Sequence, residues 1–303
     1  MIMSVRNEER FLEANLAWHH HLGVRRAYVY LDRCMDRSES IARSFPWVDV
    51  QQRDRPSSSV YLAEYLEDRA REALAAARQD GVKWLLYLDA DEFAFGDSGG
   101  GDGEDGDLTA LVRRADSDTE MIVLRPREAI PVRADPARPF WEHVYFQDGV
   151  VLERDLLDPS TGMVRRLEKL IGHKEGKSIV RVGADVEPRG SHRWRAAAGG
   201  PLRHQFLGFH YHFLVTSAAH FREKYGKFSN DPEVFHTGAP VPFPKQAFKQ
   251  AVGSMTPVDI ERYYRDWVSI DIEELERQVE AGTIVKDTRL KHVVERIVEG
   301  ARS

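Results

Sequence analysis

The sequence predicts an α/β protein in which a mostly parallel sheet is flanked by helices and followed by a mainly helical C-terminal segment. Short runs rich in β-branched and aromatic residues alternate with longer runs rich in Ala, Leu and Glu. This alternation is typical of right-handed β-α-β units and therefore of parallel strands. Of the 303 residues, 42% are hydrophobic, which is enough to bury a sizeable core.

The predicted elements follow one another regularly. Met1–Val5 predicts a short buried strand. Asn7 is placed to cap a helix that runs to Leu22, where Gly23 ends it. Residues 130–200, rich in Pro and Arg, predict loops and antiparallel strands, and the chain from Ser217 onward predicts mainly helices. The other predicted elements are strands at Arg26–Leu31, Val48–Val50, Lys83–Leu88 and Met121–Leu124, and helices at Ser38–Ser44 and Val60–Ala77.

One segment interrupts this pattern. Gly96–Asp107 (GDSGGGDGEDGD) consists almost entirely of Gly and Asp, which predicts a flexible loop. Asp and Gly alternate as they do in some calcium-binding loops, but the ligand spacing and terminal Glu of an EF-hand are missing. A solvated linker is therefore favoured. We expect one α/β domain over residues 1–225, including this loop, and a helical extension packed on it over residues 226–303.

Composition excludes several classes of protein. The formal net charge is -6 without a long Lys/Arg block, which argues against nucleic-acid binding but leaves room for a local basic pocket for phosphates. Cys34 is the only cysteine, so no intrachain disulfide forms, and a reducing compartment fits. No apolar run reaches the roughly 18–20 residues of a membrane span, and no signal peptide is visible. We expect a cytoplasmic protein, with contact to a membrane surface left open.

Three acidic residues follow the most hydrophobic predicted strand. The segment Trp84–Phe93 (WLLYLDADEF) places Asp89, Asp91 and Glu92 at the carboxyl end of that strand, the edge of a parallel sheet where ligands bind. Crowded carboxylates repel each other and are costly to bury unpaired. Mn²⁺ or Mg²⁺ would relieve both costs and would complete its shell with substrate phosphates and water. If the strand continues, Asp89 and Asp91 point the same way; the alternative is a turn with solvated acids.

Polar residues also follow the first two predicted strands. Asp32 ends the second strand, where a carboxylate can accept hydrogen bonds from a nucleobase or ribose. The alternative for Asp32 is a turn-forming aspartate. Arg6 follows the first strand and is placed to meet phosphate, whereas Asn7 is expected first as the helix cap.

Taken together, these motifs resemble the glycosyltransferase family 2-like group. Ser4–Glu8 (SVRNE) with Trp18–Val24 (WHHHLGV) is similar to the opening of that group, and Trp84–Phe93 matches its "W…D.DEF" signature. Tyr30–Asp32 stands at the group's "DN.S.D" motif, with Arg33 and Met35 in place of Asn and Ser. The later similar segments are Lys177–Arg181 with Gly190–His192, His212–Phe213 with Ser217, Phe221 and Lys224, and Val285–Leu290.

The resemblance implies a GT-A fold with residues 1–225 as the catalytic domain. It also implies metal-dependent hexosyl transfer from a nucleoside-diphosphate sugar donor to a hydroxyl acceptor on a glycan, lipid or small molecule. The donor-binding residues expected are Arg6, Asn7, Asp32, Asp89, Lys177 and Arg181. The expected ligands of Mn²⁺ or Mg²⁺ are Asp89, Asp91 and His212, with His192 and His210 as further site candidates.

An inverting reaction would need a base for the acceptor hydroxyl, and Glu92 and Asp185 are the predicted catalytic carboxylates, with Glu187 as a third candidate. Two other functions remain open. A nucleotidyltransferase would favour a Gly-rich phosphate loop near the N-terminus, but Val5–Glu9 contains no glycine. A non-catalytic sugar- or nucleotide-binding protein on the same fold is the second alternative.

Overall fold

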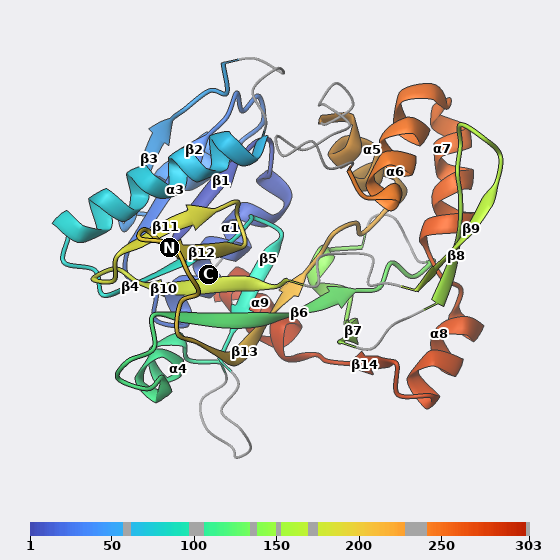
Figure 1. Cartoon of the computed structure of the whole chain (residues 1–303). Coiled ribbons are helices and arrows are strands. Elements are labelled where there is room, and N and C mark those ends of the chain that lie inside the picture. Colours follow the sequence, from blue (N-terminus) through green and yellow to red (C-terminus); the bar gives the residue numbers. More distant parts are fainter. Residues whose placement is uncertain are drawn as a thin grey trace. The chain divides into compact units, whose positions relative to one another are not determined.

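The structure is a computed structural model that describes residues 1–56, 62–96, 106–133, 138–149, 153–168, 175–227 and 241–300 (Figure 1). The chain forms two compact units. The first unit comprises Met1–Pro126, Lys174–Tyr211 and His292–Ser303; the second comprises Arg127–His173 and His212–Lys291. The units are thus interleaved along the chain, whereas the sequence predicted a single division at residues 225–226.

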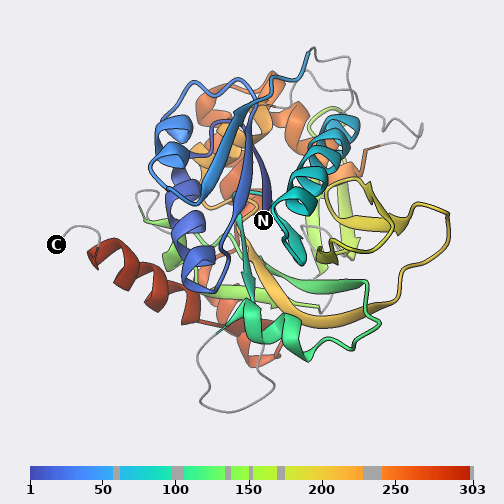
Figure 2. The same cartoon turned by 90° about the vertical axis from the view of Figure 1, so that its left-hand side faces the viewer.

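The first unit contains a central, largely parallel sheet flanked by helices, which confirms the predicted fold class. Its parallel strands are β1 (Ile2–Val5), β2 (Ala27–Leu31), β3 (Val48–Gln52) and β4 (Trp84–Tyr87), in the order β3-β2-β1-β4. Its first helices are α1 (Glu9–His21), α2 (Ser38–Arg43) and α3 (Leu62–Gln79). Figure 2 shows α1 and α2 on one face of these strands and α3 on the other. This is the double-sided covering that fully buried parallel strands require.

Antiparallel strands continue the sheet beyond β4. β10 (Lys177–Arg181) runs antiparallel to β4 and to the first part of β6 (Met121–Ala129). In this register Ser178 pairs with Tyr87 and Arg181 with Trp84, so β10 begins where β4 ends. The remaining elements with residues in this unit are β5 (Glu92–Phe95), α4 (Leu108–Arg114), β11 (Val186–Arg189), β12 (Arg193–Ala196), β13 (His204–His212) and α9 (Arg289–Gly300).

The spacing of apolar residues explains the packing of the first unit. All five side chains of β2 are buried, as expected of a strand covered on both faces. In α3 the buried residues Ala70, Ala73, Leu74 and Ala77 recur at three- and four-residue intervals and form one stripe. This stripe joins residues of β1, β2 and β4 in a single hydrophobic core.

The start of α1 differs from the prediction. Asn7 does not cap the helix; its backbone is left-handed, with φ 53, and its Oδ1 accepts a hydrogen bond from the Met35 N–H at 2.7 Å. The N–H groups of Glu8 and Glu9 donate to Ser38 Oγ and Asp36 Oδ2, at 2.8 and 2.9 Å. The helix end is therefore capped by residues about thirty positions away, which local sequence rules do not detect. Gly23, with φ 99, follows the helix as predicted.

The second unit combines short antiparallel strands with helices, and its helical content confirms the prediction for the chain after Ser217. The strands β8 and β9 form a hairpin, and β7 pairs with β14 and with the last residues of β6. The elements are the 3-10 helix Phe140–Glu142, β7 (Tyr145–Asp148), β8 (Glu153–Leu157), β9 (Val164–Glu168), α5 (Ala218–Lys227), α6 (Phe243–Ser254), α7 (Pro257–Tyr263), the π-helix Tyr264–Val268, α8 (Ile272–Glu280) and β14 (Ile284–Lys286). The helices α5, α6 and α7 lie together (Figure 1), and their aromatic residues belong to its main core.

Most of the acidic Gly/Asp segment, residues 97–105, lies outside the described residues, so its predicted flexibility stays a prediction. Its two ends are close together because Gly96 and Gly106 form an antiparallel bridge. Asp107 then caps α4 by accepting a hydrogen bond from the Thr109 N–H at 2.7 Å. Among the described residues, no helix is long and apolar enough to cross a membrane.

Candidate functional site

The four parallel strands of the first unit end at one edge, which we call the carboxyl edge. The strands lie in the order β3-β2-β1-β4, so the chain places β2 and β3 on one side of β1 and then β4 on the other side. Ligands of open α/β sheets bind at the point where the strand order switches in this way, outside the carboxyl ends of the strands. Arg6 and Asn7 follow β1, Asp32 follows β2, and the acidic segment Asp89–Glu92 follows β4. The fold therefore brings five of the predicted donor- and metal-binding positions to one edge.

The acidic segment is a turn and not a continuation of β4. The strand ends at Tyr87, and β5 begins at Glu92. The turn is closed by two hydrogen bonds: the Glu92 N–H donates to the Asp89 carbonyl at 3.1 Å, and the Asp89 N–H donates to Glu92 Oε2 at 2.9 Å. The Asp89 side chain is 40% exposed, whereas Asp91 is 6% exposed. The strand does not continue through Asp91, so the condition under which Asp89 and Asp91 were expected to point the same way is not met, and the turn decides their directions.

Helix α1 holds the backbone of this turn. Asn15 Nδ2 donates to the carbonyls of Ala90 and Glu92, at 3.0 and 2.7 Å. Trp18 Nε1 donates to the Ala94 carbonyl at 2.9 Å. Asn15 and Trp18 lie on the buried face of α1, and their N–H groups provide hydrogen-bond donors for backbone carbonyls in and just after the acidic turn.

His19 completes these contacts from α1. Its Nε2 accepts the Ala94 N–H at 3.1 Å, so the proton of the neutral ring is on Nδ1, 2.8 Å from the Asn15 carbonyl. Burial lowers the pKa of His19 to about 3, although the bond to the Asn15 carbonyl acts to raise it. His19 is therefore a neutral, structural histidine.

Lys177 lies among the acids, but not as a diphosphate contact. Its side chain is 0% exposed, and its Nζ is 2.8 Å from Asp89 Oδ2, 3.1 Å from Glu92 Oε2 and 3.3 Å from the Ser191 carbonyl. An ammonium group has three protons, and three acceptors surround this one. Lys177, which the sequence predicted as a donor-binding residue, forms an internal ion pair with the acidic turn.

Two predicted histidines also lie near the turn in the first unit. The Nε2 of His210, on β13, is 3.6 Å from Glu92 Oε1, and both side chains are buried. His192 is half-buried and its Nδ1 donates to the Gly176 carbonyl at 3.1 Å, next to Lys177. Glu92 is thus in contact with His210, Lys177 and the Asp89 N–H. These contacts favour a structural role for Glu92 in holding the turn over its predicted role as a catalytic base.

Two other predicted site residues lie at the opposite edge of the sheet. Arg181 pairs with Trp84 at the amino end of β4, and its guanidinium lies 4.3 Å from the centre of the Trp84 ring. Asp185 is exposed in the turn that follows β10. Since β4 and β10 are antiparallel, the end of β10 is remote from the acidic turn. Arg181 and Asp185 therefore do not belong to the candidate site.

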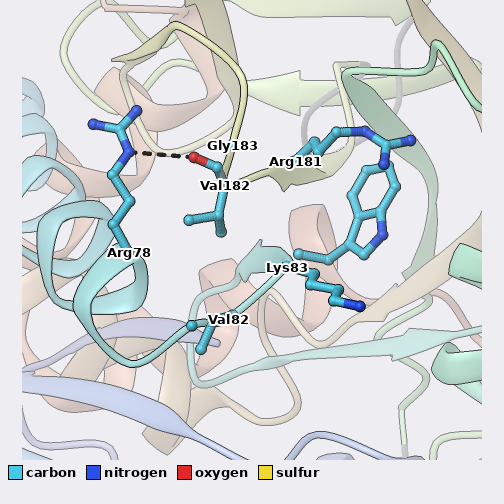
Figure 3. A pocket seen from close by; sticks show the side chains of 8 residues that line it. Arg78, Val82, Lys83, Arg181, Val182 and Gly183 are labelled. Atoms are coloured by element: carbon cyan, nitrogen blue, oxygen red, sulfur yellow. Dashed lines mark hydrogen bonds between the residues drawn. The ribbon is translucent and has the colours of Figure 1, made fainter.

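An open pocket of about 410 Å³ lies at this opposite edge (Figure 3). Arg78 closes one side of it, where its Nε donates to the Val182 carbonyl at 3.2 Å. Its lining residues are Arg78, Gly81, Val82, Lys83, Trp84, Arg181, Val182 and Gly183. None of the acids of the carboxyl edge contributes to it, so this pocket is separate from the candidate site.

His212 lies in the second unit, paired with Glu128. The Nδ1 of His212 is 3.0 and 2.9 Å from the two carboxylate oxygens of Glu128, and both side chains are buried. In the neutral ring this contact places the proton on Nδ1 and leaves Nε2 as the basic nitrogen. The sequence predicted His212 but not Glu128, since the two residues are 84 positions apart.

Asp32, which follows β2, is hydrogen-bonded to the segment that follows β3. Its Oδ1 accepts hydrogen bonds from the Arg55 N–H at 2.9 Å and from Arg33 Nε at 3.0 Å. Arg33 has φ 50, and with Asn7 it is one of the two non-glycine residues with positive φ in the described chain. Both residues lie at the carboxyl edge, and such backbone strain is typical of functional sites. Arg33 was noted in the sequence only as a departure from the family motif, and Arg55 was not predicted as a site residue, although Arg53 and Arg55 follow β3 directly.

The described residues contain no group of three or more His, Cys, Asp or Glu side chains arranged to hold a metal ion. Two carboxylates on one turn supply the hard oxygen ligands that Mn²⁺ and Mg²⁺ prefer. Such ions often take one or two protein carboxylates and complete their shell with phosphate oxygens and water. Asp89 and Asp91 therefore fit a cation held jointly with a phosphorylated ligand, but not an all-protein metal cage.

Comparisons with known proteins give low similarity. No protein-family model matches the sequence, and no curated protein matches it significantly. A mannosyltransferase from Pyrobaculum calidifontis, solved in complex with GDP-Man and Mn²⁺, is 14% identical, with 100% of this chain and 79% of that chain covered, at a TM-score of 0.35. A mycobacterial protein is 14% identical over 76% of this chain and 74% of that chain, at a TM-score of 0.38. A 4-diphosphocytidyl-2C-methyl-D-erythritol synthase is 15% identical over 60% and 73%, at a TM-score of 0.30. These TM-scores are too low to carry an argument about activity or ligand.

Proposed function

We propose that the protein is a metal-dependent glycosyltransferase that binds a nucleoside-diphosphate sugar at the carboxyl edge of the first unit. The observation that carries this proposal is the acidic turn Asp89–Glu92 at the point where the strand order reverses. Asn15 holds the backbone of the turn, Lys177 holds its side chains, and His19 holds Ala94 just after it. Crowded acids held this firmly at a ligand-binding edge favour a function that needs their negative charge.

In this proposal the residues at each strand end bind one part of the donor or its cation. Asp91 and Asp89 would bind the cation, Arg6 would face the diphosphate, and Asp32 would accept from the nucleoside. A bound Mn²⁺ or Mg²⁺ would neutralise the charge that develops on the leaving diphosphate. Glu92 is assigned to the support of the turn, because Lys177 and the Asp89 N–H already engage its carboxylate.

The loop after β1 distinguishes this proposal from a nucleotidyltransferase. A Gly-rich loop would bring backbone N–H groups to the phosphates. Here the loop contains Arg6, Asn7 and Glu8, and the left-handed position is occupied by Asn7. A side-chain contact from Arg6 is therefore favoured over a backbone cradle.

Binding measurements test the proposal directly. Isothermal titration calorimetry with UDP, GDP and CDP, each with Mn²⁺ and with EDTA, should show metal-dependent binding of at least one nucleotide. Hydrolysis over a panel of nucleotide sugars should then identify the donor. Binding without turnover of any donor would favour a non-catalytic nucleotide-binding protein. Absence of metal-dependent binding for all three nucleotides would contradict the proposed function.

A further inference from the structure

Lys177 reaches the acidic turn because of the glycine before it. Gly176 has φ 68, and a Cβ on it would lie 2.0 Å from the Leu124 carbonyl oxygen. Only glycine fits this close approach without strain. In the register of β10, Lys177 is paired with Leu124 and precedes the pair of Ser178 with Tyr87, the last residue of β4. The side chain of Lys177 therefore starts directly beside the turn that follows β4.

Among the residues that the structure describes, the two carboxylates of that turn balance the charge of Lys177. The ammonium is 0% exposed, and the carboxylate oxygens of Asp89 and Glu92, 2.8 and 3.1 Å from Nζ, supply the opposite charge that a buried cation needs. Its Nζ also lies over the Tyr87 ring, 5.7 Å from the ring centre.

We propose that Lys177 is a positioning residue: it fixes the Asp89 carboxylate and the shape of the Asp89–Glu92 turn, and acts on the ligand only through them. The inference rests on the proposed function for the identity of the ligand. Direct contact with a diphosphate would need Nζ protons that already face Asp89, Glu92 and the Ser191 carbonyl. The ion pair also offsets part of the negative charge of the turn, which keeps the acids together before a cation binds.

A charge-balanced variant separates this role from folding. Lys177→Met alone removes the cation that faces Asp89 and Glu92 and is expected to destabilise the protein. Lys177→Met combined with Glu92→Gln removes the buried charge on both sides, and Glu92→Gln alone is its matched control. In ligand-free protein, amide hydrogen exchange over residues 88–94 should be at least about tenfold faster in the double variant than in Glu92→Gln. Amide exchange in the rest of the first unit should be equally fast in the double variant and in Glu92→Gln.

A second measurement separates positioning from direct contact. Lys177→Met should weaken Mn²⁺-dependent binding of the nucleoside diphosphate about tenfold when Asp89 is present, in line with residues that orient metal ligands. In an Asp89→Asn background the same substitution should cost less than about twofold, because the side chain that Lys177 positions is already neutral. Equal losses in both backgrounds would show that Lys177 touches the ligand and would overturn the inference.

Unchanged exchange over residues 88–94 in the double variant would also overturn it. Failure of the proposed function has a different signature, because the wild-type protein would then bind none of the nucleotides in the presence of Mn²⁺. The exchange comparison needs no ligand, so it decides the role of Lys177 in that case as well.

Discussion

His19 Nε2 accepts the backbone N–H of Ala94 across 75 residues of sequence, at a distance of 3.1 Å. This bond joins a histidine of α1 to β5, just after the acidic turn. It requires the neutral ring, because a protonated imidazole has no acceptor nitrogen. The position of the acids is therefore linked to the protonation state of a histidine that is itself 0% exposed.

This relationship predicts a dependence of stability on pH. The pKa of His19 is about 3 in the folded protein against 6.5 for an ordinary histidine, so below pH 6.5 the unfolded chain binds a proton that the folded chain does not. The contribution of His19 to stability is present above pH 6.5 and is lost as pH falls towards 3. The expected slope is roughly 1.4 kcal/mol per pH unit for this one proton.

Urea unfolding of wild type and His19→Gln between pH 4 and 8 measures that slope, because glutamine can accept the same N–H without titrating. The difference in unfolding free energy between the two proteins should shrink as pH falls. A difference that stays constant over this range would mean that His19 is not held neutral.

Asp91 carries the metal in the proposed function, so Asp91→Asn should abolish turnover. It should weaken Mn²⁺-dependent nucleotide binding by about 10- to 100-fold, the usual range for loss of one charged contact. Asp185→Asn is the matched control, since Asp185 is exposed in the turn after β10, away from the acidic turn. Calorimetry on both variants with and without Mn²⁺ checks the prediction. Equal affinity of wild type and Asp91→Asn would exclude Asp91 as a ligand.

The sequence predicted the parallel strands and the position of the acids well, because both depend on local patterns. Apolar runs identify buried strands, and the carboxyl end of a strand identifies the binding edge. The residues that hold the acids were not predicted. Asn15, His19 and Lys177 act through bonds that span between 75 and 88 residues, and no local rule reports such pairs.

The assignments that fail share a cause. Lys177 and Arg181 belong to the same five-residue strand and were predicted together as donor-binding residues, but they lie at opposite ends of β10. The antiparallel direction of β10 decides which of them meets the acids. Neither the family motif at Lys177–Arg181 nor the alternation of residues in this segment tells whether the strand runs parallel or antiparallel to β4.

His212, which the sequence predicted as a metal ligand, should contribute to stability. It is paired with Glu128 in a buried position, so His212→Ala leaves a buried carboxylate without this partner. The expected cost is about 3 kcal/mol in the free energy of unfolding. The double variant His212→Phe with Glu128→Leu should recover part of this loss, because both polar groups are then absent. Urea unfolding of the single and double variants tests this, and a loss below about 1 kcal/mol in His212→Ala would contradict it.

Gly176 should tolerate no side chain. Its φ of 68 is in the left-handed region, and an added Cβ would lie 2.0 Å from the Leu124 carbonyl oxygen, a backbone atom that cannot rotate away. Gly176→Ala should therefore lower the free energy of unfolding by at least about 2 kcal/mol. Gly183, six residues on the other side of Lys177, has no atom within 4 Å of an added Cβ, so Gly183→Ala should have almost no effect. Any shift of β10 in the Gly176 variant would also move Lys177 away from Asp89 and weaken metal-dependent binding. Equal stability of the two alanine variants would show that the start of β10 adapts freely, and that the close approach to Leu124 does not place Lys177.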